Sequence, residues 1–324
     1  MKYIFLPFIN SNAGNAWRQE LEDSFISGEG SDLTAEINNI RRGKQDYINL
    51  SDYYHDLHEK KAQRQKLWLE RLALQTAAVF DDMLRRLSED ERDPKKTTII
   101  AALPEFFWVD INDNHKHEDD IINYHKPVYS ANLINCLLNK SNPLMSLTNR
   151  YHNLIFFAGT VMWKYIDGLD NKDEKIYNTL MIFGSGEIQE LWSKANISTI
   201  DGFCDWSKSK VVKDKTGHGS TNTAPVVTFN EKTFVYDICL DFIQGKDKMP
   251  LSSELYESEA DANVLICAGM SVDSNKVKDM RSNILFRCDG NGSDGTFAEI
   301  TDRSGTQLAK QTNDVIIDRL ETTV

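Results

Sequence analysis

The amino-acid sequence predicts an α/β fold, because short apolar runs typical of strands alternate with stretches of helical periodicity. The runs are rich in β-branched and aromatic residues and almost continuously apolar, as strands covered on both faces are. We expect strands at residues 3–9, 98–103, 154–162, 178–183, 225–229, 233–239, 263–267 and 314–318. Because no linker rich in proline, glycine or serine divides its 324 residues, the chain 1–324 is expected to form a single domain.

One long helix is expected between the first two strands. From about Ser51 to about Ser88, a stripe of side chains recurs at spacings of three and four residues, namely Leu69, Leu72, Ala73, Thr76, Phe80, Met83 and Leu87. Asp93 and Pro94 should end this helix. About 90 residues separate the two strands, whereas a whole βαβ unit takes about 30. We therefore predict an enlarged N-terminal helical region with an insertion at residues 11–50.

The charge of the chain limits its partners. With 49 acidic against 37 basic residues, the formal net charge is −12, so the protein should repel the phosphates of nucleic acids and anionic membrane surfaces. We expect neither as a partner. No apolar stretch reaches the roughly 20 residues of a membrane helix. Residues 1–10 are expected to form a first strand and not a signal peptide, because the apolar run is short and includes Pro7.

The cysteines indicate a reducing compartment. They contain no Cys-x-x-Cys pair and are odd in number, at Cys136, Cys204, Cys239, Cys267 and Cys288. We therefore expect free thiols and a cytoplasmic protein.

Three reactive side chains each follow an apolar run, at Glu105, Lys194 and Cys239. Taken singly, Cys239 would be a buried apolar side chain, and the other two would be solvated charges. If the three strand ends converge, however, Glu105 can take the proton of Cys239 while the Lys194 ammonium stabilises the thiolate. Lys194 and the backbone N–H of Leu240 can then stabilise the negative charge that develops during attack on a carbon atom. The set therefore predicts covalent catalysis.

The segments around these residues resemble the carbon-nitrogen hydrolases of the nitrilase superfamily. The resemblance is carried, in the family's order, by Leu103-Pro104-Glu105, Phe157-Ala-Gly159-Thr160, Tyr177-Asn-Thr179, Gly184-Ser-Gly-Glu-Ile188, Ser193-Lys194, Ile238-Cys239-Leu-Asp241, Val264-Leu-Ile-Cys-Ala-Gly269 and Asp302-Arg-Ser-Gly305. It implies a four-layer α-β-β-α sandwich and a Glu105, Lys194 and Cys239 triad. It calls for no metal and no organic cofactor. It also implies a homodimer or higher homo-oligomer, to which residues 313–320 could contribute.

The implied reaction is hydrolysis of a small-molecule amide or nitrile. Cys239 would attack the substrate carbon, Glu105 would deprotonate the thiol and protonate the leaving ammonia or amine, and Lys194 would hold the tetrahedral intermediate. Water activated by Glu105 would then cleave the thioester. An amide is preferred over a nitrile because amide cleavage is the commoner activity among relatives.

Other features leave the substrate open. No second glutamate follows Lys194, so Asp201 or Asp205 is a candidate to replace it, and His218 lies in a glycine-rich loop that could border the site. An aromatic pocket entrance is expected from Phe106, Phe107 and Trp108. The histidines His115, His117 and His125 are more typical of a polar loop than of a metal site. Two alternatives remain: a catalytically silent binding protein of the same fold, and an acyltransferase that uses the same triad.

Overall fold

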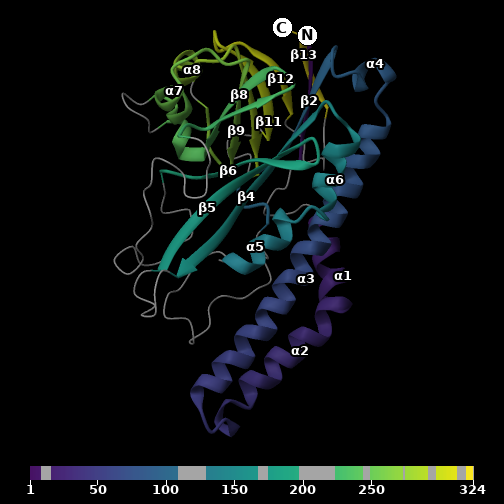
Figure 1. Ribbon diagram of the computed structural model, residues 1–324, viewed down its shortest axis with the longest axis vertical. Helices are drawn as coiled ribbons and strands as arrows, with labels where there is room; N and C mark the ends of the chain where they lie inside the picture. Colours follow the sequence, from purple (N-terminus) through teal and green to yellow (C-terminus); the bar gives the residue numbers. More distant parts are fainter. Residues whose placement is uncertain are drawn as a thin grey trace.

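The computed structural model describes residues 1–8, 16–108, 129–166, 174–196, 223–243, 249–272, 274–290, 297–311 and 319–323. These residues form two sheets with helices outside them (Figure 1), as the sequence predicts for an α/β fold. No helix in these ranges combines the length and the hydrophobicity that a transmembrane segment requires.

The first sheet is parallel at its centre and antiparallel towards its edges. Its order is β13 (Leu320–Thr323), β1 (Lys2–Pro7), β2 (Thr97–Leu103), β4 (Leu154–Ile166), β5 (Glu174–Gly184) and β6 (Glu187–Ser193). Strands β1, β2 and β4 run parallel, whereas β13, β5 and β6 each pair antiparallel with their neighbours. The short β3 (Tyr129–Ser130) pairs with β4.

The second sheet has the same plan. Its order is β12 (Gln307–Gln311), β11 (Ala298–Asp302), β10 (Ile284–Asp289), β9 (Ala262–Cys267), β8 (Lys232–Ile238) and β7 (Val226–Phe229). Strands β8, β9 and β10 are parallel, and the outer strands are antiparallel. Coverage on both faces explains why β8 and β9 are almost entirely buried and largely apolar.

Three apolar cores separate four layers. Side chains of both sheets meet in the central core, where the rings of Phe5 and Phe286 have centroids 5.3 Å apart. Residues at alternate positions of the first sheet, such as Ile4 and Leu6, face outwards against the helices. A third core joins the outer face of the second sheet to short helices, with Met280 among its members. This arrangement confirms the predicted α-β-β-α sandwich.

The helices divide between the two outer layers. On the first sheet lie α1 (Ala16–Ser27), α3 (Leu50–Arg85), α5 (Ala131–Leu138) and α6 (Pro143–Arg150). On the second lie α7 (Leu251–Leu255) and α8 (Ser274–Lys278), together with the 3-10 turn η3 (Cys239–Phe242).

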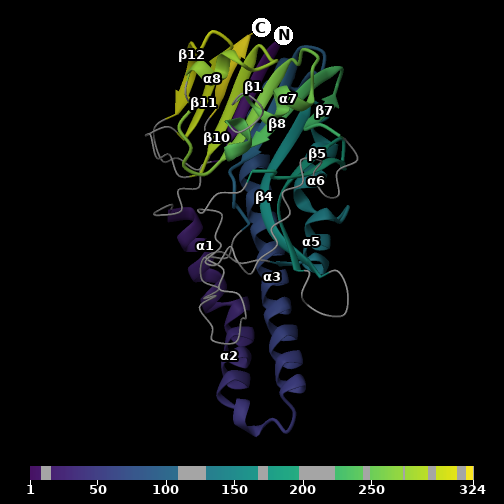
Figure 2. The same cartoon turned by 90° about the vertical axis from the view of Figure 1, so that its left-hand side faces the viewer.

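A helical hairpin extends away from the sheets. It consists of α2 (Glu29–Arg42), the 3-10 turn η1 (Lys44–Asp46) and the first part of α3, and its tip lies far from the two chain ends (Figures 1 and 2). Ile37, Tyr53 and Leu57 form a small core between its helices. The predicted insertion at 11–50 coincides with α1, α2 and η1 over the described residues, and its boundaries stay a prediction.

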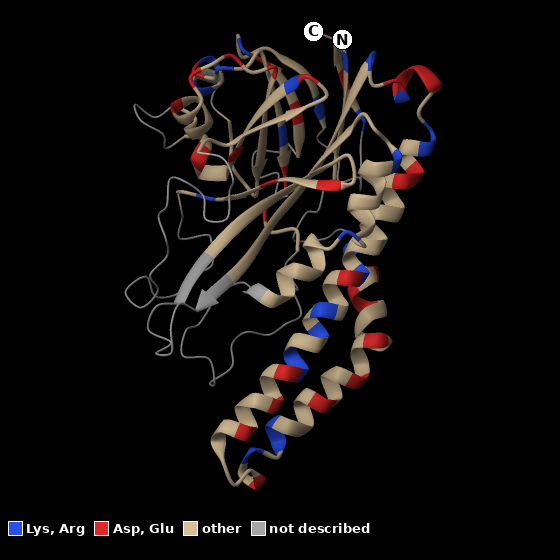
Figure 3. Cartoon of the chain, in the orientation of Figure 1, with Lys and Arg blue, Asp and Glu red and all other residues tan. Residues whose placement is uncertain are grey.

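Charged residues of both signs lie along this hairpin (Figure 3). Two ion pairs join α2 to α3, between Glu36 and Lys60 at 2.7 Å and between Glu29 and Arg71 at 3.0 Å. Because these side chains are partly in water, each pair contributes little to stability, typically below about 1 kcal/mol.

The predicted helix 51–88 is α3, but it ends earlier than expected. The earlier end of α3 has a local cause. Ser88 caps a separate short helix, α4 (Glu89–Arg92), by accepting a hydrogen bond from Glu91 N, while the Glu91 carboxylate accepts one from Ser88 N at 2.9 Å. Such a reciprocal capping box begins a new helix, so the break lies before Asp93 and Pro94.

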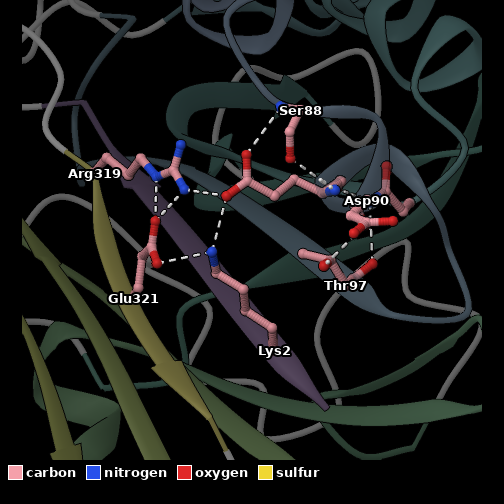
Figure 4. A network of polar contacts seen from close by, with 8 residues as sticks. Lys2, Ser88, Asp90, Thr97, Arg319 and Glu321 are labelled. Atoms are coloured by element: carbon pink, nitrogen blue, oxygen red, sulfur yellow. Dashed lines mark hydrogen bonds and ion pairs between the residues drawn. The ribbon is translucent and has the colours of Figure 1, made fainter.

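A polar network joins the two ends of the chain to α4 (Figure 4). Lys2 of β1 lies 2.8 Å from Glu91 and 2.8 Å from Glu321 of β13, and Arg319 pairs with both carboxylates. The Lys2 ammonium, followed by the Ser88 backbone N–H and Arg319, lowers the pKa of Glu91 to about 2. The network therefore fastens β13 and α4 to opposite sides of the first strand.

Seven of the predicted strands coincide with β1, β2, β4, β5, β7, β8 and β9. The eighth, at 314–318, lies outside the described residues. Strands β3, β6, β10, β11, β12 and β13 have no counterpart among the predicted strands. In β6 polar residues are mixed with apolar ones, and β10 contains the buried charges Arg287 and Asp289, so neither has a continuous apolar run.

Candidate active site

Glu105 lies immediately after β2, at the carboxyl end of a central strand of the first sheet. Its side chain is 1% exposed, and its Oε1 atom accepts hydrogen bonds from Lys194 Nζ at 2.8 Å and from Asn178 Nδ2 at 2.9 Å. A buried carboxylate requires such compensation, because removing a charge from water is costly. Glu105 and Lys194 therefore form one buried unit.

Lys194 reaches Glu105 because β5 and β6 form an antiparallel hairpin. Thr179 pairs with Ser193, and the next step of the ladder is a hydrogen bond from Lys194 N to Asn178 O at 2.8 Å. The Lys194 side chain is fully excluded from solvent. The hairpin thus places an ammonium and the Asn178 amide on the same carboxylate.

Strand β4 packs closely against the turn that carries Glu105. Gly159 has a φ of 65°, and a Cβ atom there would lie 2.6 Å from Pro104 O and 2.9 Å from Leu103 Cβ. The following residue, Thr160, accepts a hydrogen bond from Phe106 N at 2.9 Å. Only glycine allows β4 to approach the Glu105 turn this closely.

Cys239 is the first residue of η3 and follows β8. Its φ is 48°, a left-handed value that costs a residue with a side chain about 1–2 kcal/mol. Ile238 pairs with Ile266 in the parallel β8–β9 ladder, so Cys239 lies level with Cys267. Its half-buried side chain packs against the outer core to which Cys267 belongs. Strained residues of this kind cluster at functional sites.

Two sets of hydrogen bonds bring the three strand ends together. Glu105 N donates to Cys267 O at 3.4 Å, which joins the end of β2 to the end of β9, beside Cys239. On the other side, Asp241 of η3 accepts from the backbone N–H groups of Ala195 and Asn196, at 3.1 and 2.7 Å. The ends of β2, β6 and β8 therefore lie near one another, which is the condition that the sequence analysis set for a triad. Glu105 and Lys194 are bonded directly, and Cys239 is linked to them through the neighbouring residues of its turn.

Burial makes three of the described thiols harder to ionise. Burial raises the pKa of Cys136 to about 11 and the pKa values of Cys267 and Cys288 well above the ordinary range. Both Cys267 and Cys288 also experience the negative charge of Asp289. Cys136, Cys239, Cys267 and Cys288 form no disulfide, as expected, and Cys204 lies outside the described residues.

A buried ion cluster shapes the turn after β9. Arg287 pairs with Asp289 at 2.7 Å and with Glu299 at 3.3 Å, and it also donates to Met270 O. Asp289 in turn accepts from the N–H groups of Gly269 and Met270. The segment that follows Cys267 is therefore held by side chains of β10.

The predicted aromatic entrance needs a correction. Phe107 and Trp108 are buried in the core between the first sheet and its helices: the Phe107 ring packs edge-on against Phe8, and Trp108 Nε1 donates to Ala158 O at 2.7 Å. Both rings are apolar enough to be drawn into that core, so they do not line a pocket entrance. Phe106 is also buried, with a φ of 61°, and its part in substrate binding stays a prediction.

Of the remaining residues that the sequence analysis named, most lie outside the described part of the chain and one, Leu240, lies within it. Asp201, Asp205, His218 and the histidines His115–His125 lie outside the described residues. Leu240 is half-buried and is the second residue of η3. Because the first N–H groups of a helical turn have no acceptor within that turn, the Leu240 N–H suits the predicted role of donor, which stays a prediction.

Sequence reasoning missed two residues of this group. Asn178 and Asp241 both lie in the quoted motifs, but no role was assigned to either. The signal that could have found them is their place in the pattern: Asn178 is a polar residue within β5, just before its apolar run Leu180–Phe183, and Asp241 lies two residues after Cys239.

Comparisons with known proteins give similarity to solved structures alone. No family model matches the chain, and no curated protein matches it. Among solved structures, it is similar to Nit3 of Saccharomyces cerevisiae, described as a member of branch 10 of the nitrilase superfamily, with 14% identity, a TM-score of 0.48, and coverage of 99% of this chain and 89% of that one.

Two further similarities have the same coverage of 99% and 89%. One is to a carbon-nitrogen hydrolase of Helicobacter pylori G27, with 10% identity and a TM-score of 0.47. The other is to an amidase from Nesterenkonia sp. AN1, solved in complex with acrylamide, with 9% identity and a TM-score of 0.42.

Proposed function

We propose that this chain is a carbon-nitrogen hydrolase of the nitrilase superfamily, which cleaves a small-molecule amide through a cysteine thioester. One observation carries the proposal: the buried Glu105–Lys194 pair, 2.8 Å apart, at the place where the Cys239 turn meets the ends of β2 and β6. A nucleophile, a base and a cation in one buried region are what acyl transfer from an amide requires.

In the first half of the reaction, Cys239 attacks the carbonyl carbon and its proton passes to Glu105. The carbonyl oxygen becomes an oxyanion, which the Lys194 ammonium and the Leu240 N–H stabilise. Glu105 then gives the proton to the nitrogen, the C–N bond breaks, and ammonia or an amine leaves. The acyl group remains on Cys239 as a thioester.

In the second half, water replaces the leaving group. Glu105 takes a proton from a water molecule, which attacks the thioester, and the same proton returns to the Cys239 sulfur when the C–S bond breaks. The product is a carboxylic acid, and the enzyme is restored. A single carboxylate serves both halves because it alternates between base and acid.

The burial of Glu105 and Lys194 favours this chemistry. In a region of low dielectric constant, a fixed cation interacts more strongly with developing negative charge than it would in water. Asn178 and Lys194 both bind Oε1 of Glu105, so they fix the orientation of the carboxylate.

The test is ammonia release from a panel of small amides, carbamoyl compounds and nitriles. We expect an amide to be the best substrate and Cys239→Ser to lose activity. Glu105→Gln should lower turnover by about 10²- to 10⁴-fold, the usual contribution of general acid–base catalysis. If Cys239→Ser or Cys239→Ala releases ammonia at the parent rate, the mechanism is wrong. A product conjugated to an added amine would identify an acyltransferase instead.

One observation favours the alternative of a silent binding protein. At the tip of the hairpin, Ile48 is fully exposed and Leu50 is 58% exposed, and apolar side chains in such positions are typical of contact surfaces. Iodoacetamide separates the two functions, because a thiolate activated for catalysis reacts much faster near neutral pH than an ordinary thiol. Slow and uniform labelling of all cysteines would favour the silent protein.

A further inference from the structure

Asp241 connects the turn of the nucleophile to the turn of the lysine. Its side chain is 1% exposed. It accepts three hydrogen bonds, from Ala195 N at 3.1 Å, from Asn196 N at 2.7 Å and from Asn196 Nδ2 at 3.0 Å. The acceptor lies two residues after Cys239, and the donors directly follow Lys194. These bonds therefore join the turn that carries Cys239 to the turn that carries Lys194.

We propose that Asp241 is a positioning residue, which holds the Lys194 ammonium in place beside the Cys239 thiol by fixing one turn to the other. The inference rests on the proposed function, since it assigns Asp241 a part in activating that thiol. Asp241 itself touches no reacting atom. Its effect passes through Ala195 and Asn196 to the backbone of Lys194, which is also held by Asn178 O.

A second aspartate of the same segment provides a contrast. Asp237, two residues before Cys239, is also 1% exposed. It accepts from Ser252 N and Ser252 Oγ of α7 and from Asn263 Nδ2 of β9. It thus binds the second sheet to its outer helix, and these hydrogen bonds run to α7 and β9 and not to the Lys194 turn. Asp237→Asn is the matched control, because it removes a buried charge at the same separation from Cys239.

The charges around Asp241 explain why its protonation matters. Burial raises the pKa of Asp241 to about 7, against the lowering effects of the Lys194 charge and of the Ala195 and Asn196 N–H groups, and Asp237 adds to the rise. The elements packed against η3 also carry the Cys267 thiol on β9 and Glu254 on α7. The ionised form accepts with both oxygens, whereas protonation turns one oxygen into a donor.

The experiment measures alkylation of Cys239 by iodoacetamide as a function of pH, with mass spectrometry to follow each cysteine of the chain. The variants are Asp241→Asn, Asn196→Ala and the control Asp237→Asn. We expect Asp241→Asn to raise the apparent pKa of the Cys239 thiol and to slow alkylation at pH 7 about tenfold, the factor that one pKa unit represents. Asn196→Ala should change both in the same direction and by less. Asp237→Asn leaves the bonds to the Lys194 turn intact, so it should leave both at the parent values or shift them in the opposite direction, as the loss of a nearby anion does.

The direction of the change in the Cys239 thiol pKa distinguishes a positioning role of Asp241 from a purely electrostatic one. Removing a nearby anion stabilises a thiolate, so an Asp241 that acted as a charge alone would give a lower thiol pKa and faster alkylation in Asp241→Asn. Asn196→Ala removes no charge, and Asn196 is half-buried, so this variant carries the test even if Asp241→Asn does not fold. Unchanged or faster alkylation in the folded variants overturns the inference. If Cys239 of the parent reacts no faster than Cys136, the proposed function fails first, and the inference fails with it.

Discussion

The ammonium of Lys194 lies 2.8 Å from Oε1 of Glu105, and both side chains are almost completely excluded from solvent. Lys194→Met should therefore destabilise the fold by about 3–5 kcal/mol, because it leaves a buried carboxylate without its cation. The double variant Glu105→Gln with Lys194→Met should be more stable than Lys194→Met alone. Urea denaturation measures both. The exposed pair of Glu36 and Lys60 is the control, and Lys60→Met should cost less than about 1 kcal/mol.

Glycine at position 239 should stabilise the fold relative to alanine while both abolish activity. At a φ of 48°, alanine keeps the steric conflict of a Cβ atom and glycine removes it. We expect Cys239→Gly to exceed Cys239→Ala by roughly 1 kcal/mol in the free energy of unfolding. Ser185, in an exposed turn with a φ of 53°, should show the same order without loss of activity. An alanine variant as stable as the glycine variant would show that the turn relaxes at no cost.

Gly159→Ala should lower both stability and ammonia release. The new Cβ atom would lie 2.6 Å from Pro104 O, on a backbone with a φ of 65°, and would push the Glu105 turn away from β4. We expect a loss of about 1–3 kcal/mol in thermal or urea unfolding. Gly43→Ala is the control, because its nearest neighbours would be at 3.4 Å and its φ is −85°. Equal effects of the two substitutions would contradict the close packing behind Glu105.

Glu91 should contribute stability above pH 4.5 that is lost as the pH falls towards 2. Lys2 and then the Ser88 backbone N–H and Arg319 lower the pKa of this carboxylate to about 2 in the folded chain, below its ordinary value. The unfolded chain therefore takes up the proton first on acidification, which favours unfolding. The difference in unfolding free energy between the parent and Glu91→Gln should shrink across this range. It should also shrink in high salt, since the network is partly exposed. A constant difference from pH 7 to pH 2 would count against the network.

Asp241 should have the opposite effect on stability. Burial raises its pKa to about 7 in the folded chain, so between about pH 4 and pH 7 the folded state holds a proton that the unfolded state has released, and stability falls as the pH rises. Since one pKa unit corresponds to about 1.4 kcal/mol, the full change is on the order of 4 kcal/mol. Asp241→Asn should lack this component. Urea unfolding of the parent and of Asp241→Asn at pH 5 and pH 8 measures this contribution. Equal changes of the unfolding free energy with pH in the two proteins would refute the prediction.

Much of the fold can be predicted because burial leaves a direct mark on the sequence. Strands β1, β2 and β9 are nearly continuous apolar runs, and Glu105 and Cys239 stand out because each follows an apolar strand at its end. Strands such as β6 and β10 escape prediction, because a polar edge or a buried ion cluster around Arg287 hides the pattern.

The apolar pattern of the sequence by itself determined that strands end at Glu105 and Cys239 and that a reactive residue stands at each end. Only the tertiary structure decided which neighbours those residues have. Hydrophobicity does not distinguish an aromatic ring in a pocket from one in a core, so Phe107 and Trp108 could be placed only once the helices covered them. The partners of Asp241 likewise depend on a hairpin that brings residues 195 and 196 beside η3. Contacts between segments far apart in the chain arise from sheet pairing and packing, which no local pattern encodes.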